Sequence, residues 1–135
     1  MDFEKQKLHL ELVQNVITRM NSNSFAIKGW VITLVTAIYG LAISTSNKSI
    51  LYLSIFVTLT FWGLDGYYLY QERLYRKLYD YVRLEGTSTD FNLNASIYKG
   101  AGRTWFGSTF SITMLVLYLS ILVVTVILIA TVKYK

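Results

Sequence analysis

The distribution of charged side chains constrains this chain more than any other feature of its sequence. Residues 104–132, a run of 29, carry no charge, and neither do the 19 residues 29–47. Between Lys48 and Glu72 the only charged residue is Asp65. Because a helix needs about 20 apolar residues to cross about 30 Å of hydrocarbon, these runs predict an all-α integral membrane protein with three spans. We place the spans at residues 25–44, 49–68 and 110–131.

The residue types that are missing exclude several classes of function. The 135 residues are 53% hydrophobic and include no cysteine, which excludes disulfides, a thiolate nucleophile and a cysteine-ligated zinc. His9 is the single histidine, so a histidine-rich metal site is excluded, and we expect no Ser-His-Asp triad within one chain. We expect one membrane domain over residues 1–135 that is not an enzyme and holds no cofactor.

Lysine and arginine set the expected orientation, because cytoplasmic segments close to a span carry an excess of them. With the N-terminus inside, ten basic residues lie on the cytoplasmic side and three on the other side. We therefore expect a multi-pass protein of the plasma membrane with a cytoplasmic N-terminus and an external C-terminus.

Three segments are expected on the cytoplasmic side of the membrane. Residues 2–20 carry apolar side chains on one helical face, which predicts an amphipathic helix, and the polar residues 21–24 are expected to end it before the first span. The second span meets no proline and is expected to continue as a helical stalk over 69–85, followed by a polar loop over 86–107. On the amphipathic helix, packing of His9 is favoured over a role as pH sensor.

Tyrosines alternate with basic residues along the predicted stalk. Tyrosine rings stack on bases and basic side chains neutralise phosphates, so the stalk is a candidate receptor for a phosphorylated ligand. An alternative is a solvated arm that packs against its copies and contacts anionic lipid. The candidate ligand-binding residues are Arg73, Tyr75, Arg76, Lys77, Tyr79 and Arg83.

Two charged residues, Lys28 and Asp65, fall inside the predicted spans. A short link makes the first two spans antiparallel, so both residues lie about one turn inside the cytoplasmic end of a span. Unpaired charges there are costly, which predicts an ion pair or a shared water-filled vestibule. Hydroxyl side chains recur along the same helices, either as packing seams or as a pore lining. The candidate gate or ion-path residues are Lys28, Asp65, Thr33, Thr36, Ser54 and Thr58.

Two stretches of the sequence are distinctive. They are HLELVQNVITRM at 9–20 with SFAIKGW at 24–30, and FWGLDGYY at 61–68 with QERLYRKLYD at 71–80. Together they resemble a widespread family of small bacterial membrane proteins of mostly unassigned function. The general plan is similar to transmembrane effectors of antiphage defence systems. In the Hailong type, a membrane channel subunit is paired with a nucleotidyltransferase whose oligonucleotide product controls it. The resemblance implies a homo-oligomeric channel in the bacterial inner membrane whose opening depolarises the infected cell.

Three hypotheses for the function follow. The first is a pore that is gated from the cytoplasm by a nucleotide or oligonucleotide. Three helices do not enclose an aqueous path alone, so a pore requires a symmetric homo-oligomer, with a tetramer as the first guess. The second is a non-conducting membrane anchor or scaffold that recruits a soluble partner protein. The third, a small transporter, is least favoured because no internal repeat or broken helix marks a substrate site.

Overall fold

The computed structural model describes residues 2–85, 90–100 and 104–132. Regular structure within these ranges is entirely helical, and α1, α2 and α4 are each long and apolar enough to cross a membrane. The all-α class with three such helices is therefore confirmed, and the fold is compatible with a multi-pass membrane protein. The elements are α1 (Asp2–Thr45), α2 (Ser49–Glu85), the short 3-10 helix η1 (Ala95–Tyr98), α3 (Trp105–Thr109) and α4 (Ile112–Thr131).

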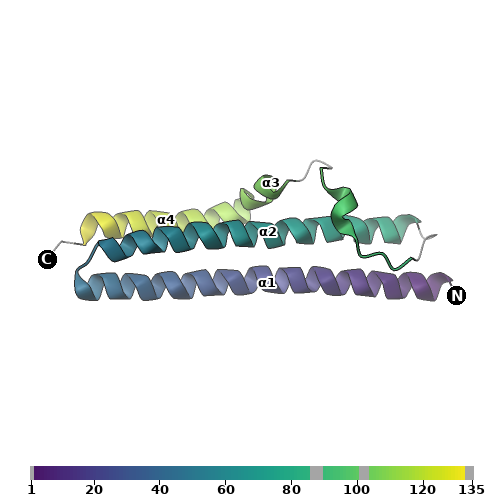
Figure 1. The fold of residues 1–135 in the computed structure, drawn as a ribbon, viewed down its shortest axis with the longest axis horizontal. Helices are drawn as coiled ribbons and strands as arrows, with labels where there is room; N and C mark the ends of the chain where they lie inside the picture. The colour runs from purple at the N-terminus through teal and green to yellow at the C-terminus, as the bar shows by residue number, and fades with distance from the viewer. Residues whose placement is uncertain (1, 86–89, 101–103, 133–135) are drawn as a thin grey trace.

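The three long helices lie side by side, with α2 between α1 and α4 (Figure 1). The turn between α1 and α2 is tight: Ser46 has φ 52°, and the Asn47 N–H donates to the carbonyl of Ala42 at 3.1 Å. The Asn47 side chain then accepts from the Ser49 N–H at 3.0 Å and so caps the start of α2. This turn makes α1 and α2 antiparallel, and the start of α1 and the end of α4 lie at opposite ends of the molecule (Figure 1).

The helix break that the sequence predicted at residues 21–24 is wrong. α1 is continuous from Asp2 to Thr45, so the predicted segments 2–20 and 25–44 belong to one helix of 44 residues. Asparagine and serine are only about 0.5 kcal/mol less favourable than alanine inside a helix, and neither removes a backbone donor as proline does. The Ser24 hydroxyl also finds partners inside the bundle.

One apolar core joins the first half of α1 to the last half of α2. Ala95 of η1 belongs to this core, so the segment before η1 packs against the same pair of helices. At about 1.5 Å per residue, the 37 residues of α2 extend about 55 Å, well beyond the thickness of a hydrocarbon layer. The buried residues of this core are Val13, Ile17, Leu74, Leu78, Val82 and Ala95.

A second core joins α4 to the other halves of α1 and α2. Val31 and Val35 of α1 pack there with Met114 and Tyr118 of α4. Most of α4 nevertheless remains uncovered, and large apolar side chains such as Val126 are exposed. Such a surface is unfavourable in water and favourable in lipid, which agrees with a helix that crosses a membrane.

Candidate functional site

A buried carboxylate lies at the point where α1, α2 and α4 meet. Asp65 occupies the middle of α2 and is 0% exposed. Two positions of α2 at the same level, Gly63 and Gly66, carry no side chain, which lets α3 approach α2 there. A charge in such a place is stable only if its oxygens are paired and hydrogen-bonded.

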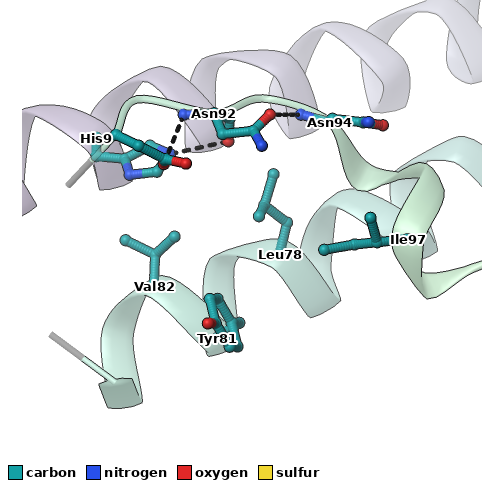
Figure 2. Close-up of a pocket in the computed structure, with 8 residues that line it drawn as sticks. His9, Leu78, Tyr81, Val82, Asn92, Asn94 and Ile97 are labelled. Atoms are coloured by element: carbon teal, nitrogen blue, oxygen red, sulfur yellow. Dashed lines mark hydrogen bonds between the residues drawn. The ribbon is translucent and has the colours of Figure 1, made fainter. Parts of the chain in front are cut away.

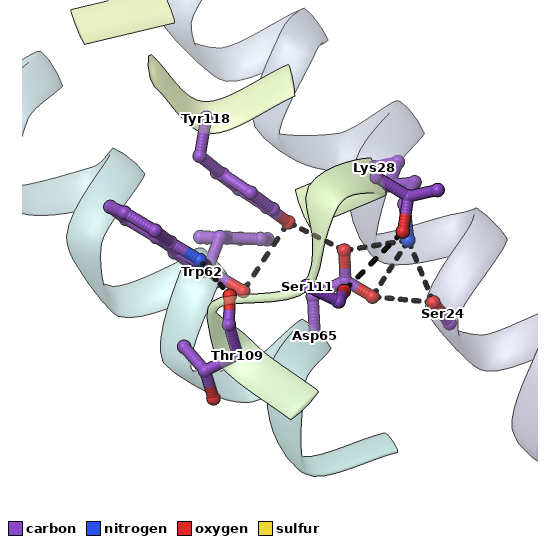
Figure 3. Close-up of polar contacts among 9 residues, drawn as sticks. Ser24, Lys28, Trp62, Asp65, Thr109, Ser111 and Tyr118 are labelled. Carbon is purple, nitrogen blue, oxygen red and sulfur yellow. Dashed lines mark hydrogen bonds and ion pairs between the residues drawn. The ribbon is translucent and has the colours of Figure 1, made fainter. Parts of the chain in front are cut away.

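Three side chains satisfy the Asp65 carboxylate (Figure 3). The Lys28 ammonium lies 2.7 Å from Oδ2 and 2.9 Å from Oδ1. The Ser24 hydroxyl accepts from Lys28 at 2.8 Å and donates to Asp65 Oδ1. From α4, the Tyr118 hydroxyl donates to Oδ2 at 2.9 Å. We call Ser24, Lys28, Asp65 and Tyr118 the carboxylate cluster, and its formal charge is zero.

Aromatic packing holds the Tyr118 hydroxyl in position. The Trp62 ring stacks on the Tyr118 ring, with centroids 5.7 Å apart and planes at 4°. The Trp62 indole N–H donates to the carbonyl of Thr109 at 2.8 Å, and the Trp105 indole N–H donates to the carbonyl of Gly63 at 3.2 Å. Together these bonds attach α3 to α2, and Figure 3 shows the bond between Trp62 and Thr109 beside the carboxylate cluster.

A second group of polar side chains lies nearer the start of α2, close to the turn at residues 46–48. The hydroxyls of Tyr39 and Thr125 are 2.5 Å apart, and Ser54 Oγ lies 3.4 Å from the Thr125 hydroxyl. Ser54 and Thr58 are fully buried, and their hydroxyls also donate to carbonyls of α2 itself. Each hydroxyl is therefore satisfied within one copy of the chain.

The candidate gate residues separate into three groups. Lys28 and Asp65 form the predicted ion pair, which is confirmed. Ser54 and Thr58 are buried inside the bundle, while Thr33 and Thr36 are exposed on α1, Thr36 at the edge of a shallow pocket between α1 and α4. The sequence-based set therefore does not line one common path within a single copy. Whether any of these residues gates an ion path stays a prediction.

The candidate ligand-binding residues of α2 are spread around the helix. Arg76 pairs with Glu72 at 2.7 Å, and Arg83 pairs with Asp80 at 3.3 Å. Arg73 donates to the Ser108 hydroxyl at 3.1 Å and so contacts the α3 turn. Lys77, Tyr75 and Tyr79 are half-buried, and the two tyrosines pack against the core between α1 and α2. These six residues do not converge on one pocket, and their role in ligand binding stays a prediction.

Sequence reasoning missed two members of the carboxylate cluster. Ser24 lies four residues before Lys28, a spacing that places both on one helical face. Tyr118 is the one tyrosine of the third span, and a phenol inside an apolar helix needs a hydrogen-bond partner. Both signals were present in the sequence, but the partner of each depends on how the helices are rotated.

The side chains of the carboxylate cluster pair with and donate hydrogen bonds to the Asp65 carboxylate. Among the residues that the structure describes, no group of three histidine, aspartate or glutamate side chains is placed to hold a metal ion. No protein-family model, curated protein or solved structure matches this chain. The contacts of the cluster join three helices, so breaking or keeping them affects how α1, α2 and α4 are held together.

We expect Tyr118→Phe to lower the free energy of unfolding by about 1–2 kcal/mol, because Asp65 loses one donor while the ring stays stacked on Trp62. Denaturation in detergent, followed by circular dichroism, measures this change. Tyr52→Phe is the matched control, since Tyr52 is an exposed tyrosine of α2. Equal effects of the two variants would contradict the bond to Asp65.

Proposed function

We propose that this chain is the subunit of a homo-oligomeric membrane pore that is controlled from the cytoplasm. In this proposal the helices α1, α2 and α4 cross the bacterial inner membrane, with the N-terminus in the cytoplasm and the C-terminus outside. The last part of α2 and the first part of α1 project into the cytoplasm as the stalk and the amphipathic segment, together with η1. The loop predicted over 86–107 lies in part outside the described residues, at 86–89 and 101–103.

One observation carries the proposal: a stripe of small and hydroxyl residues on α1 that stays exposed to the outside of the bundle in the part of the chain that the structure describes. A side chain added at Gly29 or Gly40 would meet no atom within 4 Å. Glycine inside a helix costs about 1 kcal/mol relative to alanine, so two uncovered glycines call for a reason outside the single copy. We call this face the α1 stripe, and its members Gly29, Thr33, Thr36, Gly40 and Ser44 are all exposed.

Small and hydroxyl residues at helical spacing are typical of surfaces where membrane helices approach each other or where they meet water. The buried hydroxyls of Ser54, Thr58 and Thr125 already have partners within one copy, so we propose that an aqueous path runs between copies, along the α1 stripe. Closed rotational symmetry brings the same stripe of every subunit to one axis, and a tetramer is the simplest such ring to test. The carboxylate cluster then holds the three helices of each subunit as one rigid unit.

The physiological role that we propose is antiphage defence by membrane depolarisation. It is motivated by the general plan of the chain, which is similar to that of transmembrane effectors of antiphage defence systems such as the Hailong type. The proposed partners are further copies of the chain, the lipid membrane, and a nucleotidyltransferase whose nucleotide or oligonucleotide product sets the open or closed state.

The decisive experiment compares two exposed threonines with identical local bonding. The Thr33 hydroxyl donates to the carbonyl of Gly29 on the α1 stripe, and the Thr60 hydroxyl donates to the carbonyl of Phe56 on α2, each at 2.9 Å. We expect Thr33→Leu to weaken self-association and ion flux by about tenfold or more, because overpacking a close helix contact costs about 1–3 kcal/mol. Thr60→Leu is expected to change neither.

Native mass spectrometry from lipid nanodiscs measures the number of copies, and ion flux from liposomes measures conduction. A discrete ring of wild-type subunits that Thr33→Leu disrupts supports the pore. A wild-type chain that stays monomeric in lipid rejects it.

A non-conducting anchor is the second candidate, and one observation favours it. The first part of α1 exposes large apolar side chains, Phe3, Leu8 and Leu12, outside the proposed span. Such residues suit contact with a soluble partner protein. An anchor predicts that a soluble partner is retained by the wild type and lost from Leu8→Lys, while liposomes that contain the protein show no ion flux in any condition.

A further inference from the structure

A cavity of about 220 Å³ lies where the first turns of α1, the last turns of α2 and the segment before η1 come together. His9 and Asn92 line one side of it, and Leu78 and Val82 rise from α2 on the other side (Figure 2). None of the six candidate ligand-binding residues lines it. The cavity is thus a separate feature from the basic surface of α2.

His9 gives the clearest sign that a molecule binds in this cavity. Its side chain is 1% exposed, and Nε2 lies 3.1 Å from the carbonyl oxygen of Asn92. A carbonyl oxygen only accepts, so Nε2 carries the hydrogen of the neutral ring and Nδ1 is an acceptor. Among the residues that the structure describes, Nδ1 has no hydrogen-bond partner. A buried acceptor without a partner is costly, which favours a molecule that donates to it once the side chains that close Nδ1 off from solvent move aside.

The segment before η1 brings further polar groups to the same cavity. Asp90 Oδ1 accepts from the Asn92 N–H at 3.0 Å, and Asn92 Oδ1 accepts from the Asn94 N–H at 2.9 Å. Asn94 Oδ1 accepts in turn from the Ser96 N–H at 3.0 Å. Each bond uses one acceptor oxygen, so the two carboxamide NH₂ groups and the second oxygen of Asp90 remain to bind another molecule.

We propose that this cavity binds a flat, uncharged nitrogen heterocycle of nucleobase size. The apolar side chains of Leu78 and Val82 suit the faces of such a ring. His9 Nδ1 and the Asp90 carboxylate accept from its N–H groups, while the asparagine amides donate to its ring nitrogens or carbonyls. Among the described residues of the lining, Asp90 is the one that carries a charge, so we expect a phosphate to be repelled and to stay outside. The same base chemistry comes from two sources, a free nucleoside or one base of an oligonucleotide.

A bound base would touch α1, α2 and the segment before η1 at once. That segment continues along the chain towards α3 and α4, so occupancy of the cavity favours one arrangement of these parts. The regulatory role of the site rests on the proposed function, whereas binding is measured without any conduction.

The test is calorimetric titration of the full chain in lipid nanodiscs with adenosine, guanosine, cytidine and uridine, followed by short single-stranded oligonucleotides of each base. We expect at least one base to bind with a Kd below about 1 mM. His9→Gln keeps a donor for the Asn92 carbonyl and removes Nδ1, so it is expected to weaken binding by about tenfold.

A second pair of variants keeps the test independent of folding. Ile97 lines the cavity and is 66% exposed, while Leu84 is 75% exposed and outside the lining. Ile97→Trp fills the cavity and is expected to abolish binding, and Leu84→Trp is the control that preserves it. If a nucleoside binds as tightly as the oligonucleotide of the same base, the ligand of the cavity is the free nucleoside. If the oligonucleotide binds more tightly and its affinity falls with salt, the ligand is one base of the polymer.

Two results overturn the site: no binding of any nucleoside or oligonucleotide, or binding that Ile97→Trp leaves unchanged. Failure of the site and failure of the proposed function are distinguishable. Base binding that Ile97→Trp abolishes, in a protein that shows no ion flux, upholds the site and rejects the pore. If an oligonucleotide changes ion flux equally in the wild type and in Ile97→Trp, the pore is upheld and the site is rejected.

Discussion

Replacing Asp65 with alanine is expected to lower the free energy of unfolding by about 3–5 kcal/mol, the largest effect of any single substitution in this chain. The change leaves the Lys28 ammonium beside an apolar bundle with only the Ser24 hydroxyl as partner. It also removes the acceptor of the Tyr118 hydroxyl. Denaturation in mixed detergent, followed by circular dichroism, measures the loss.

A surface ion pair of the same chain serves as the control for Asp65→Ala. Arg83 and Asp80 are 3.3 Å apart, and each side chain is 59% exposed. Exposed pairs of this kind contribute at most about 1 kcal/mol, so Asp80→Ala is expected to have a small effect. Equal losses for Asp65→Ala and Asp80→Ala would contradict the burial of Asp65.

A double variant separates the ion pair from the packing around it. Lys28→Met with Asp65→Leu replaces both charges by apolar side chains of similar size, and such replacements of buried pairs are often neutral or stabilising. We therefore expect the double variant to recover most of the stability that Asp65→Ala loses. A double variant as unstable as Asp65→Ala would show that the Ser24 and Tyr118 bonds, rather than the charge pair, hold the helices.

The sequence predicted those features that depend on charge and on depth along a helix. Uncharged runs located three long apolar helices because a single charged residue is costly in hydrocarbon. The Lys28–Asp65 pair followed from the antiparallel link and from equal depth, without any knowledge of side-chain packing. Both predictions needed only the rise per residue of a helix and the cost of an unpaired charge.

The sequence did not predict the features that depend on how each helix is rotated about its own axis. Ser54 and Thr33 are both hydroxyl residues in apolar helices, yet Ser54 faces α4 and Thr33 faces outwards. Which side of a helix is covered depends on the packing of all three helices, and spacing within one helix does not contain that information.

The break predicted at 21–24 failed for a different reason. Asparagine and serine favour turns when nothing competes, but Ser24 is bonded to both Lys28 and Asp65 inside the bundle. Tertiary contacts of this kind outweigh a weak local preference. A polar run within a helix is therefore a poor predictor of a boundary when it also supplies a partner for a buried charge.

Gly66→Ala is expected to detach the α3 turn from α2 and to lower the free energy of unfolding by about 1–3 kcal/mol. A Cβ at Gly66 would lie 2.9 Å from Thr109 Cβ and 3.0 Å from Thr109 Cα. Backbone atoms cannot rotate away as a flexible side chain does, so the turn itself must shift. The shift stretches the bond between the Trp62 indole and the Thr109 carbonyl, and the fluorescence of Trp62 stacked on Tyr118 reports it.

Two other glycines of the chain are matched controls for this prediction. A Cβ at Gly63 would lie 3.7 Å from the Trp105 ring, an ordinary contact, and one at Gly29 would meet no atom within 4 Å. In a monomeric detergent state, Gly63→Ala and Gly29→Ala are expected to be neutral or to stabilise α2 and α1 by up to about 1 kcal/mol, since alanine favours a helix. If Gly66→Ala stabilised the protein as these two do, α3 would not be docked at Gly66, and the Trp62–Tyr118 stack would have to be held by α4 alone.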